Sequence, residues 1–463
     1  MKKGFSSVFL VMILGSMILV SLAFAEVSAS AAAESCAEDL CLLTGRSLLS
    51  EYKKELFDRY GIFMMRSYED ELSEIAAFYL RTDLALSSAA LKMACTDVSV
   101  STEMYPGLNT DLFLEQVRKL GALEAAENLI DAPMLKEIID GAEERLSSGL
   151  SASEVLDKLD ELGASIQNDD SEGEERERIK QAKTLSKRLK EASKEGKTPA
   201  VSRTSIPASV RKKLPSAQLG VKGRGSLLFS GGIAELGAGN IALGEYILAN
   251  CSDAAESRSD TYIKLETEYI LYGASSDSLN QKLARNSLYA LRFSLNLYSI
   301  LTEPGLLSSV SGAAALFPLL PRTVTAAALT LIWTGIETKH DIDLLFEGSV
   351  VPLLKNAGDF ATSLTSFIDK GRITSAPAAV GRYGSYRDYL RLLLLLLPEQ
   401  EKAVRLMDVM EMNVSLVDGA SFAFRDYSYG FDLKAGFTRK RYLDGIMGLV
   451  YGPAYVEQTH KYK

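Results

Sequence analysis

The sequence predicts a predominantly helical α+β protein, in which a long N-terminal transmembrane helix continues into an extracytoplasmic ectodomain with a small antiparallel sheet. Three observations carry this prediction. An uncharged apolar run opens the chain, apolar residues recur at three- and four-residue steps through much of the remainder, and two later stretches alternate apolar with polar residues. The chain has 463 residues, of which 47% are hydrophobic and 24% charged, as is typical of folded proteins.

The opening run is long enough to cross a bilayer. Residues 5–25 are uncharged, and 21 helical residues at about 1.5 Å each cover about 31 Å, close to the hydrocarbon thickness of about 30 Å. Lys2 and Lys3 precede the run and Glu26 follows it, so the positive-inside rule places the N-terminus in the cytoplasm and the bulk of the chain outside. We expect the anchor to contact the lipid bilayer through Phe5, Val8, Leu10, Ile13, Leu14, Ile18, Leu19 and Leu22.

Three fates are open for this segment. Ala23-Phe24-Ala25 fits a signal-peptidase site, whose use would release a secreted protein. A prepilin-like leader would be cut between Gly4 and Phe5, although Phe9 stands at the fifth mature position, where such proteins usually carry glutamate. The uncharged run 5–25 is longer than the apolar region of a signal peptide, which usually has about 7 to 15 residues. We therefore expect a retained anchor, uncleaved or trimmed at its leader.

The apolar helix is expected to continue beyond the bilayer. The stretch AEVSASAAAESCAEDLCLLTGRSLLSEYKKELFDRYG contains no proline, and Gly61 is a natural helix stop. Three- and four-residue steps give this helix one apolar face. The residues of that face are Cys36, Leu40, Leu43, Leu49, Tyr52, Leu56 and Tyr60.

Composition divides the chain into four parts. We predict a transmembrane anchor at 1–25, a mainly helical extracytoplasmic region at 26–165, a charged linker with proline and glycine that is poorly ordered at 166–234, and an α+β ectodomain at 235–463. The basic part of the linker, RKKLPSAQLGVKGRG, suits either a solvated tether or a contact for an acidic polymer, a lipid headgroup or a protein.

The last part contains the clearest element signals. TYIKLETEYILYG alternates and predicts a strand, and Ser275, Ser276 and Asp277 offer caps for a helix through SLNQKLARNSLYALRFSLNLYSIL. Pro318 and Pro321 split an apolar stretch into pieces too short to span a membrane, which predicts two buried helices. The six consecutive leucines in LRLLLLLLPEQ predict a helix enclosed by protein, and alternating aromatics in ASFAFRDYSYGFDLKAGFTRKRY predict one or two antiparallel strands. Nearby tyrosines, in RYGSYRDY, fit a binding surface or core packing equally well.

No catalytic, cofactor-binding or metal-binding residue is predicted. Gly237-Ala-Gly239-Asn-Ile-Ala242 matches a dinucleotide-binding pattern, but no clear strand precedes it and no second strand carries a suitable acidic residue. Glu337 and His340 would share a helix face, yet no further ligand is evident, so His340 is expected to be an ordinary surface histidine. Two histidines and four scattered cysteines argue against a zinc site or a disulfide framework, and a net charge of −9 argues against nucleic-acid binding.

Five stretches together resemble a family of membrane-anchored bacterial proteins of unknown function that occur with tight-adherence (Tad) pilus systems. They are GFSSVFLVMILGSMILVSLAFAE, SLLSEYKKELFDRYGIFMM, LETEYILYGASSDSLN, LTLIWTGIETKHDIDLLFEGSVVPLL and SYRDYLRLLLLLLPEQEKAVRLMDVMEMNV. The resemblance implies a pseudopilin-like or pilus-associated component with the topology of TadE-like proteins, whose partners are other pilin-like or pilus-assembly proteins. It implies no catalytic residue.

These observations favour a non-catalytic scaffold of the bacterial cell surface, held by a single membrane pass. Two alternatives belong to other classes. A cell-envelope hydrolase would need two carboxylates that converge in a cleft, and a secreted binding protein would need cleavage after Ala25.

Overall fold

The computed structural model describes most of the chain as two compact units. The first unit contains Met1–Gln116 and Val414–Lys463, and the second contains Val117–Asn413. The described residues are 2–87, 92–127, 180, 204–225, 237–317, 322–364, 384–418, 421–440 and 454–462. Most of the predicted linker, including both of its boundaries, therefore lies outside the described residues.

The helices of the first unit confirm the long N-terminal helix. They are α1 (Lys2–Leu49), α2 (Lys54–Tyr60), α3 (Glu69–Ser87) and the first residues of α4 (Thr110–Glu127). The helical stretch expected to end at Gly61 is interrupted after Leu49. In the interruption, the N–H of Lys53 bonds to Met64 O at 2.8 Å. Gly61 does stop α2, with a left-handed φ of 69° that suits glycine.

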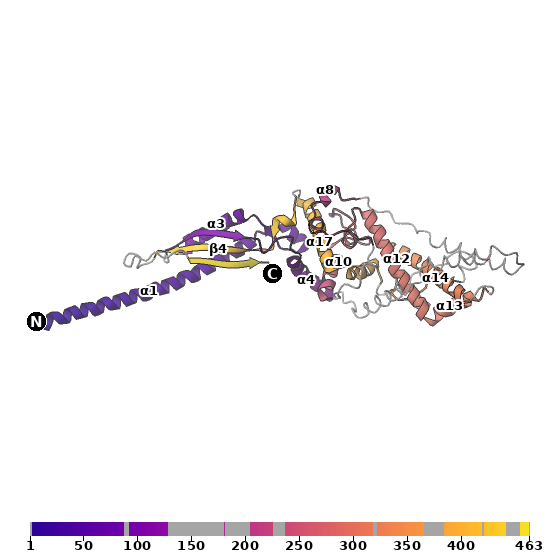
Figure 1. The fold of residues 1–463 in the computed structure, drawn as a ribbon, viewed down its shortest axis with the longest axis horizontal. Coiled ribbons are helices and arrows are strands. Elements are labelled where there is room, and N and C mark those ends of the chain that lie inside the picture. The colour runs from indigo at the N-terminus through magenta and orange to yellow at the C-terminus, as the bar shows by residue number, and fades with distance from the viewer. Residues whose placement is uncertain are drawn as a thin grey trace. The chain divides into compact units, whose positions relative to one another are not determined.

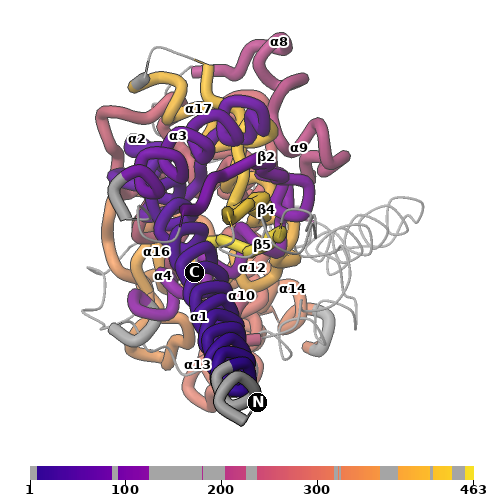
Figure 2. Tube along the Cα trace, turned by 90° about the vertical axis from the view of Figure 1, so that its left-hand side faces the viewer, coloured from indigo at the N-terminus to yellow at the C-terminus, as the bar shows by residue number. Residues whose placement is uncertain are grey.

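An antiparallel sheet covers one side of α1. Its strands β2 (Met93–Ser101), β4 (Gly430–Arg439) and β5 (Ala454–Lys461) lie in the order β2-β4-β5. Residues from opposite ends of the sequence pair directly, as in Met93 with Arg439. Figure 1 shows the N-terminal part of α1 extending away from these strands, and Figure 2 shows the helix beside β4 and β5. The predicted antiparallel strands near the C-terminus are thus confirmed.

A two-stranded sheet completes the described strands of the first unit. It pairs β1 (Met65–Arg66) with β3 (Tyr427–Ser428), which follows a short 3₁₀ helix, η2 (Phe424–Asp426). Along the chain, β1 precedes β2 and β3 directly precedes β4.

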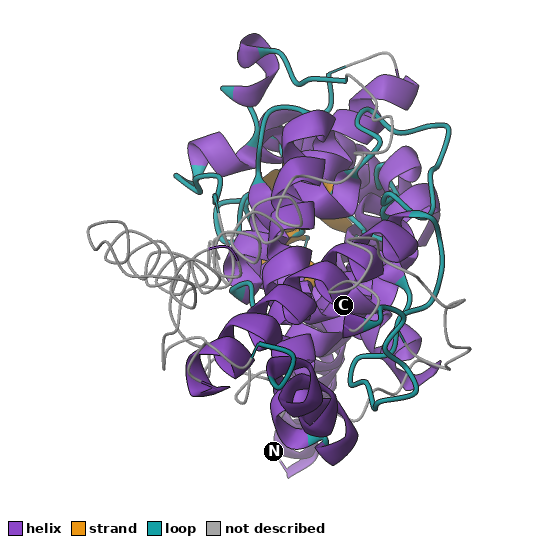
Figure 3. Ribbon diagram, turned by 90° about the vertical axis from the view of Figure 1, so that its right-hand side faces the viewer, coloured by secondary structure: helices purple, strands orange, loops and turns teal. Residues whose placement is uncertain are grey.

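The described residues of the second unit form helices joined by loops (Figure 3). Their helices are α8 (Ala208–Arg211), α9 (Pro215–Gln218), α10 (Ala238–Asn250), α11 (Glu266–Tyr272), α12 (Asp277–Thr302), α13 (Pro304–Ala314), α14 (Arg322–Phe346), α16 (Tyr386–Leu395) and the larger part of α17 (Glu399–Asp418). An apolar cluster that includes Ile300, Leu329 and Trp333 joins α12, α13 and α14.

The strand predicted in TYIKLETEYILYG is wrong, because its second half forms α11. All seven residues of α11 are buried, so the alternation of acidic and apolar residues does not mark one wet and one dry face. Instead the carboxylates of Glu266 and Glu268 lie inside the protein, where the N–H groups of Ser252 and Ala254 donate to them.

The other helix predictions in this region are confirmed. Ser276 caps α12 by accepting from the N–H of Leu279, and α16 is largely buried. Two helices, α13 and α14, form where a second membrane span had been considered, but α13 is only partly buried, through Leu306, Val310, Ala313 and Ala314. Tyr386 and Tyr389 are buried, so this pair packs in the core and does not form a surface.

Residues 204–225 of the predicted linker are packed within the second unit. Ile206 and Leu214 are buried, and Arg224 forms a bidentate ion pair with Glu401. Arg224, which the sequence analysis assigned to a linker, therefore pairs with a residue 177 positions away.

Candidate functional site on the N-terminal helix

The first half of α1 has an exposed apolar surface. Among the described residues, α1 is the helix long and apolar enough to cross a membrane. Val8, Leu10, Ile13, Leu14, Ile18 and Leu19 are between 43% and 67% exposed, and Leu22 is half-buried. Gly4 and Phe5 lie within α1. A contiguous apolar surface of this kind marks a membrane or protein contact.

The exposed half ends at an ion pair. Glu26, the first charged residue after the apolar run, is buried and meets the guanidinium of Arg439 at 2.5 Å. The same guanidinium donates to Ser30 Oγ at 3.3 Å. Arg439 is the last residue of β4, so this pair marks the level on α1 at which packing against the sheet begins.

The second half of α1 has a buried apolar stripe at helical spacing. It packs against alternate side chains of β4, all of which point to one face of the sheet. The stripe and its partners on β4 are Ala33, Ala37, Leu40, Cys41, Leu48, Phe431, Leu433, Ala435 and Phe437. One helix therefore has a bare apolar half and a half that forms the core of a folded unit.

Close packing between α1 and β5 depends on a glycine. A Cβ atom at Gly45 would overlap the imidazole of His460, so the helix can approach the strand only where it has no side chain. Farther along, Gln458 donates to Glu38 O at 3.0 Å and the hydroxyl of Tyr462 donates to Leu49 O at 2.7 Å.

Burial shifts two titratable groups at this contact toward their neutral forms. It raises the pKa of the Cys41 thiol to about 12, with the nearby Cys95 adding to the effect. It also lowers the pKa of His460, as does the neighbouring Arg46, while Asp432 acts in the opposite direction. These groups are held neutral in a packed interior, which suits structure more than acid–base chemistry.

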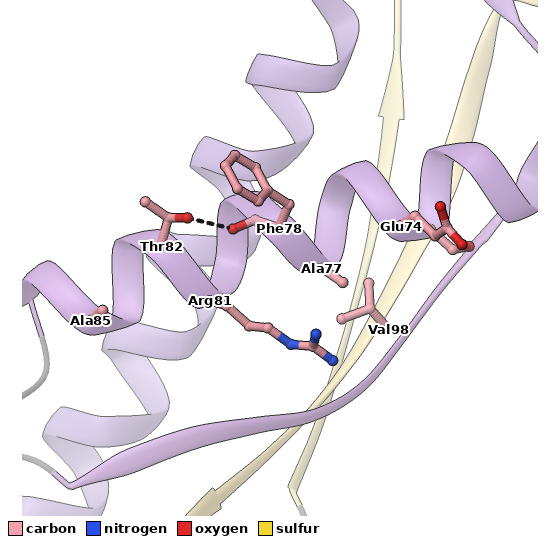
Figure 4. A pocket seen from close by; sticks show the side chains of 8 residues that line it. Glu74, Ala77, Phe78, Arg81, Thr82, Ala85 and Val98 are labelled. Atoms are coloured by element: carbon pink, nitrogen blue, oxygen red, sulfur yellow. Dashed lines mark hydrogen bonds between the residues drawn. The ribbon is translucent and has the colours of Figure 1, made fainter.

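Two surface grooves lie beside these elements. The first, of about 790 Å³, is bounded by α3 and β2 (Figure 4). Phe78 is 66% exposed at its edge, and the side chain of Arg81 extends toward β2. The second, of about 430 Å³, lies between α1 and the strands β4 and β5 and includes Glu34, Glu38 and Arg439.

The interior of the second unit contains an ion network that includes the acidic neighbours of His340. Arg292 bonds Asp341 at 2.6 Å, and Lys355 meets both Asp341 and Glu337 at 2.5 Å. Burial would raise the pKa of Asp341, but Arg292 and Lys355 together hold that pKa below its usual value. Glu337 and Asp341 are therefore occupied by structural partners, and His340 is half-buried beside them.

A second group of buried acidic residues lies on α11 and in the loop before it. Glu268 accepts from the Tyr386 hydroxyl at 2.7 Å and from Ala254 N at 3.0 Å. Burial, with the nearby Asp253, raises the pKa of Glu268 to about 8. The carboxylate of Asp253 lies 2.9 Å from Arg387. These contacts attach the loop that contains Asp253 and Ala254 to α11 and α16.

Two more buried ionisable side chains lie on α17. Burial raises the pKa of Asp408 to about 6, although Ser216 N and the Tyr269 hydroxyl donate to its carboxylate at 2.8 Å each. Burial lowers the pKa of Lys402 to about 7, and its ammonium group donates to Asn240 O at 3.2 Å. The hydrogen-bond partners of Asp408 and Lys402 could not be predicted from a sequence pattern, because each pair is more than a hundred residues apart.

The dinucleotide-like pattern serves helix packing. Gly237 is the N-cap of α10, and a Cβ at Gly239 would approach Arg118 Nε within 2.8 Å. The carbonyl of Ala242 lies against Gly121 of α4, where a Cβ would overlap it. Within the described ranges, no group of three or more His, Cys, Asp or Glu side chains could hold a metal ion.

Comparison with known proteins adds one finding. A model described as a family of unknown function (DUF5702) matches residues 168–439, more than half of the chain. The matched segment takes in most of the second unit and β4, and it leaves out α1 and β2. No curated protein and no solved structure matches the chain.

Proposed function

We propose that this chain, which belongs to the family of unknown function DUF5702, is a non-catalytic, single-pass component of the bacterial cell membrane that holds its two units on the extracytoplasmic side. One observation carries the proposal. In α1 an exposed apolar half is continuous with a half that packs on an antiparallel sheet. Such a helix joins a bilayer anchor to a folded unit without a flexible joint.

More specifically, we propose a pseudopilin-like or accessory role in a Tad-type pilus or a related cell-surface assembly. The support is the arrangement of the first unit together with the five stretches that resemble Tad-associated proteins. Other pilin-like or pilus-assembly proteins would contact the exposed helix in the membrane plane, and the second unit would present a surface outside. In the second unit, Arg292 and Lys355 pair with Asp341, and Lys355 also pairs with Glu337, so these buried charges have structural partners, which favours a scaffold over a hydrolase.

A secreted binding protein is the second candidate, and one observation favours it. Cleavage after Ala25 would leave Glu26 as the first residue, and Glu26 is where packing on the sheet begins. The first unit would then remain whole without its anchor.

Mass spectrometry of the N-terminal peptide, with fractionation of the producing cells, tests the proposal. We expect the chain in the membrane fraction, beginning at Met1 or Phe5, and degraded by protease added to intact cells stripped of their wall. A start at Glu26 with the protein in the medium would establish the secreted alternative. Protection from added protease in unbroken cells would contradict both.

A further inference from the structure

The interior of the second unit brings a lysine amine against a side-chain carboxamide. Lys402, in the first turn of α17, is 0% exposed, and Asn240, in the first turn of α10, is 4% exposed. The Nζ atom of Lys402 donates to Asn240 O at 3.2 Å and also contacts Asn240 Oδ1. The carboxamide carbon is bonded to Oδ1 at about 1.2 Å, so this carbon lies within reach of the amine.

The surroundings favour the neutral, nucleophilic form of the amine. Burial lowers the pKa of Lys402 to about 7, although Glu399 acts in the opposite direction. Lys402 and Asn240 both lie in the first turn of a helix, where the positive end of the helix dipole disfavours an ammonium ion. At pH 7 about half of these amines are therefore unprotonated and have the unshared electron pair that a nucleophilic lysine needs.

A carboxylate lies beside the same pair. Glu399 is three residues before Lys402 on α17, a spacing that places both side chains on one face of the helix. Its Oε1 atom is 3.1 Å from the position that a Cβ would take on Gly239, the residue before Asn240. Arg118 holds this carboxylate with two hydrogen bonds, at 2.7 and 2.6 Å. Glu399 is thus placed to accept a proton from the amine and to return it to a leaving nitrogen.

We propose that Lys402 and Asn240 form an intramolecular isopeptide bond that joins α17 to α10. The neutral Nζ attacks Cγ of Asn240, a C–N bond forms, and the bond between Cγ and Nδ2 breaks. One proton moves from Nζ through Glu399 to Nδ2, which leaves as ammonia. No electron is gained or lost, so the step needs neither an oxidant nor a reductant.

The bond would connect two residues that are 162 positions apart. A covalent link across so long a stretch restricts the unfolded chain and so stabilises the second unit. This inference goes beyond the proposed function and does not depend on anchoring by α1, because all the residues that carry it belong to the second unit.

Mass spectrometry of the full-length protein, purified in detergent, tests the proposal. We expect an intact mass about 17 Da below the mass calculated from the observed N-terminus, because one ammonia is lost when the bond forms. Trypsin should release residues 225–258 joined to residues 392–405, since a modified Lys402 is not cleaved. Lys402→Met and Asn240→Ala should each have their full calculated mass.

A second buried lysine is the matched control within the same digest. Lys355 is also in the second unit, but its ammonium group is held by ion pairs with Glu337 and Asp341. Trypsin should therefore cleave after Lys355 and release residues 340–355 unmodified. Equal modification of both lysines would contradict a reaction that is specific to the contact with Asn240.

The role of Glu399 is tested by two further variants. Glu399→Gln should lower the linked fraction of freshly made protein by about tenfold or more, because the proton transfer is lost. Arg118→Gln breaks the same ion pair but keeps the carboxylate, and it should retain the link. A linked fraction that stays at the wild-type level in Glu399→Gln, or falls equally in both variants, would refute proton transfer by Glu399.

Two results on the wild-type protein would overturn the isopeptide bond itself. The first is an intact mass equal to the calculated one. The second is a loss of about 17 Da in which residues 225–258 and 392–402 are recovered as separate peptides, because an asparagine that cyclises onto its own backbone also releases ammonia.

Discussion

The two units differ in what they enclose. The core of the first unit is an apolar cluster in which α1 and α3 pack against the sheet. The second unit also has an apolar cluster. In addition, all charged side chains that are at most 1% exposed among the described residues belong to the second unit. They are Asp253, Glu266, Glu268, Asp277, Arg292, Glu337, Asp341, Lys402, Arg405 and Asp408.

This difference predicts how the stability of each unit responds to substitutions and to pH. Apolar packing does not depend directly on pH, but a close-packed core has no room for added atoms, so overpacking destabilises it. A buried charge needs every partner, because removing one leaves the other without water or a counter-ion. We therefore expect the second unit to be sensitive to loss of single partners and to pH, and the first to be sensitive mainly to steric change.

The largest effect is expected from Arg292→Met. This change leaves Asp341 buried with one cation fewer, and it removes donors to Pro352 O, Leu353 O and Asn296. The free energy of unfolding should fall by about 3–5 kcal/mol. Urea unfolding of the full-length protein in detergent measures the loss, and hydrogen exchange should place it in the second unit.

The matched control for Arg292→Met is Arg285→Met on the same helix. Arg285 pairs with Asp343 at 2.6 Å, but both side chains are partly exposed. Its loss should cost about 1 kcal/mol or less. Equal losses in the two variants would mean that burial does not govern these pairs.

A smaller, pH-dependent effect is expected from Glu268→Gln. The folded pKa of Glu268 is about 8, above the usual value of 4.5, so the folded state holds a proton that the unfolded state releases. This carboxyl therefore disfavours folding increasingly as pH rises from about 4.5 to about 8. Glutamine keeps an acceptor for Tyr386, and the variant should gain stability over wild type as pH rises, by up to a few kcal/mol.

The measurement is the melting temperature of both proteins at intervals between pH 5 and pH 8.5. Parallel curves would contradict the assigned protonation of Glu268. Glu256→Gln is a suitable control, because that side chain is 56% exposed and pairs with Arg387 at the surface.

The smallest effect is expected from Gly45→Ala in the first unit. The added methyl group would meet the ring of His460, and such overpacking costs about 1–3 kcal/mol. Gly15→Ala, on the same helix, has open space around it and should be neutral or slightly stabilising through helix propensity. A stability of Gly45→Ala equal to that of Gly15→Ala would show that β5 moves easily against α1.

Helical periodicity and capping residues predicted α12, α13, α14 and α16, because long apolar patterns and caps such as Ser276 are local signals. The same reasoning failed at α11, where acidic residues that usually indicate a solvent face are buried. The apolar part of the candidate site was predictable residue by residue. Its ion pair was not, because Glu26 and Arg439 are 413 positions apart.

The sequence alone determined that residues 5–25 form an uncharged helical segment of membrane-spanning length and that most of the remainder is helical, since both follow from local composition and period. Only the tertiary structure decided that β2 and the strands near the C-terminus share one sheet beside α1, and that charged side chains buried in the second unit have ion-pair or hydrogen-bond partners there. Those features depend on contacts between residues distant in sequence. Whether a carboxylate is solvated or buried depends on the partners that folding brings to it, and composition does not record them.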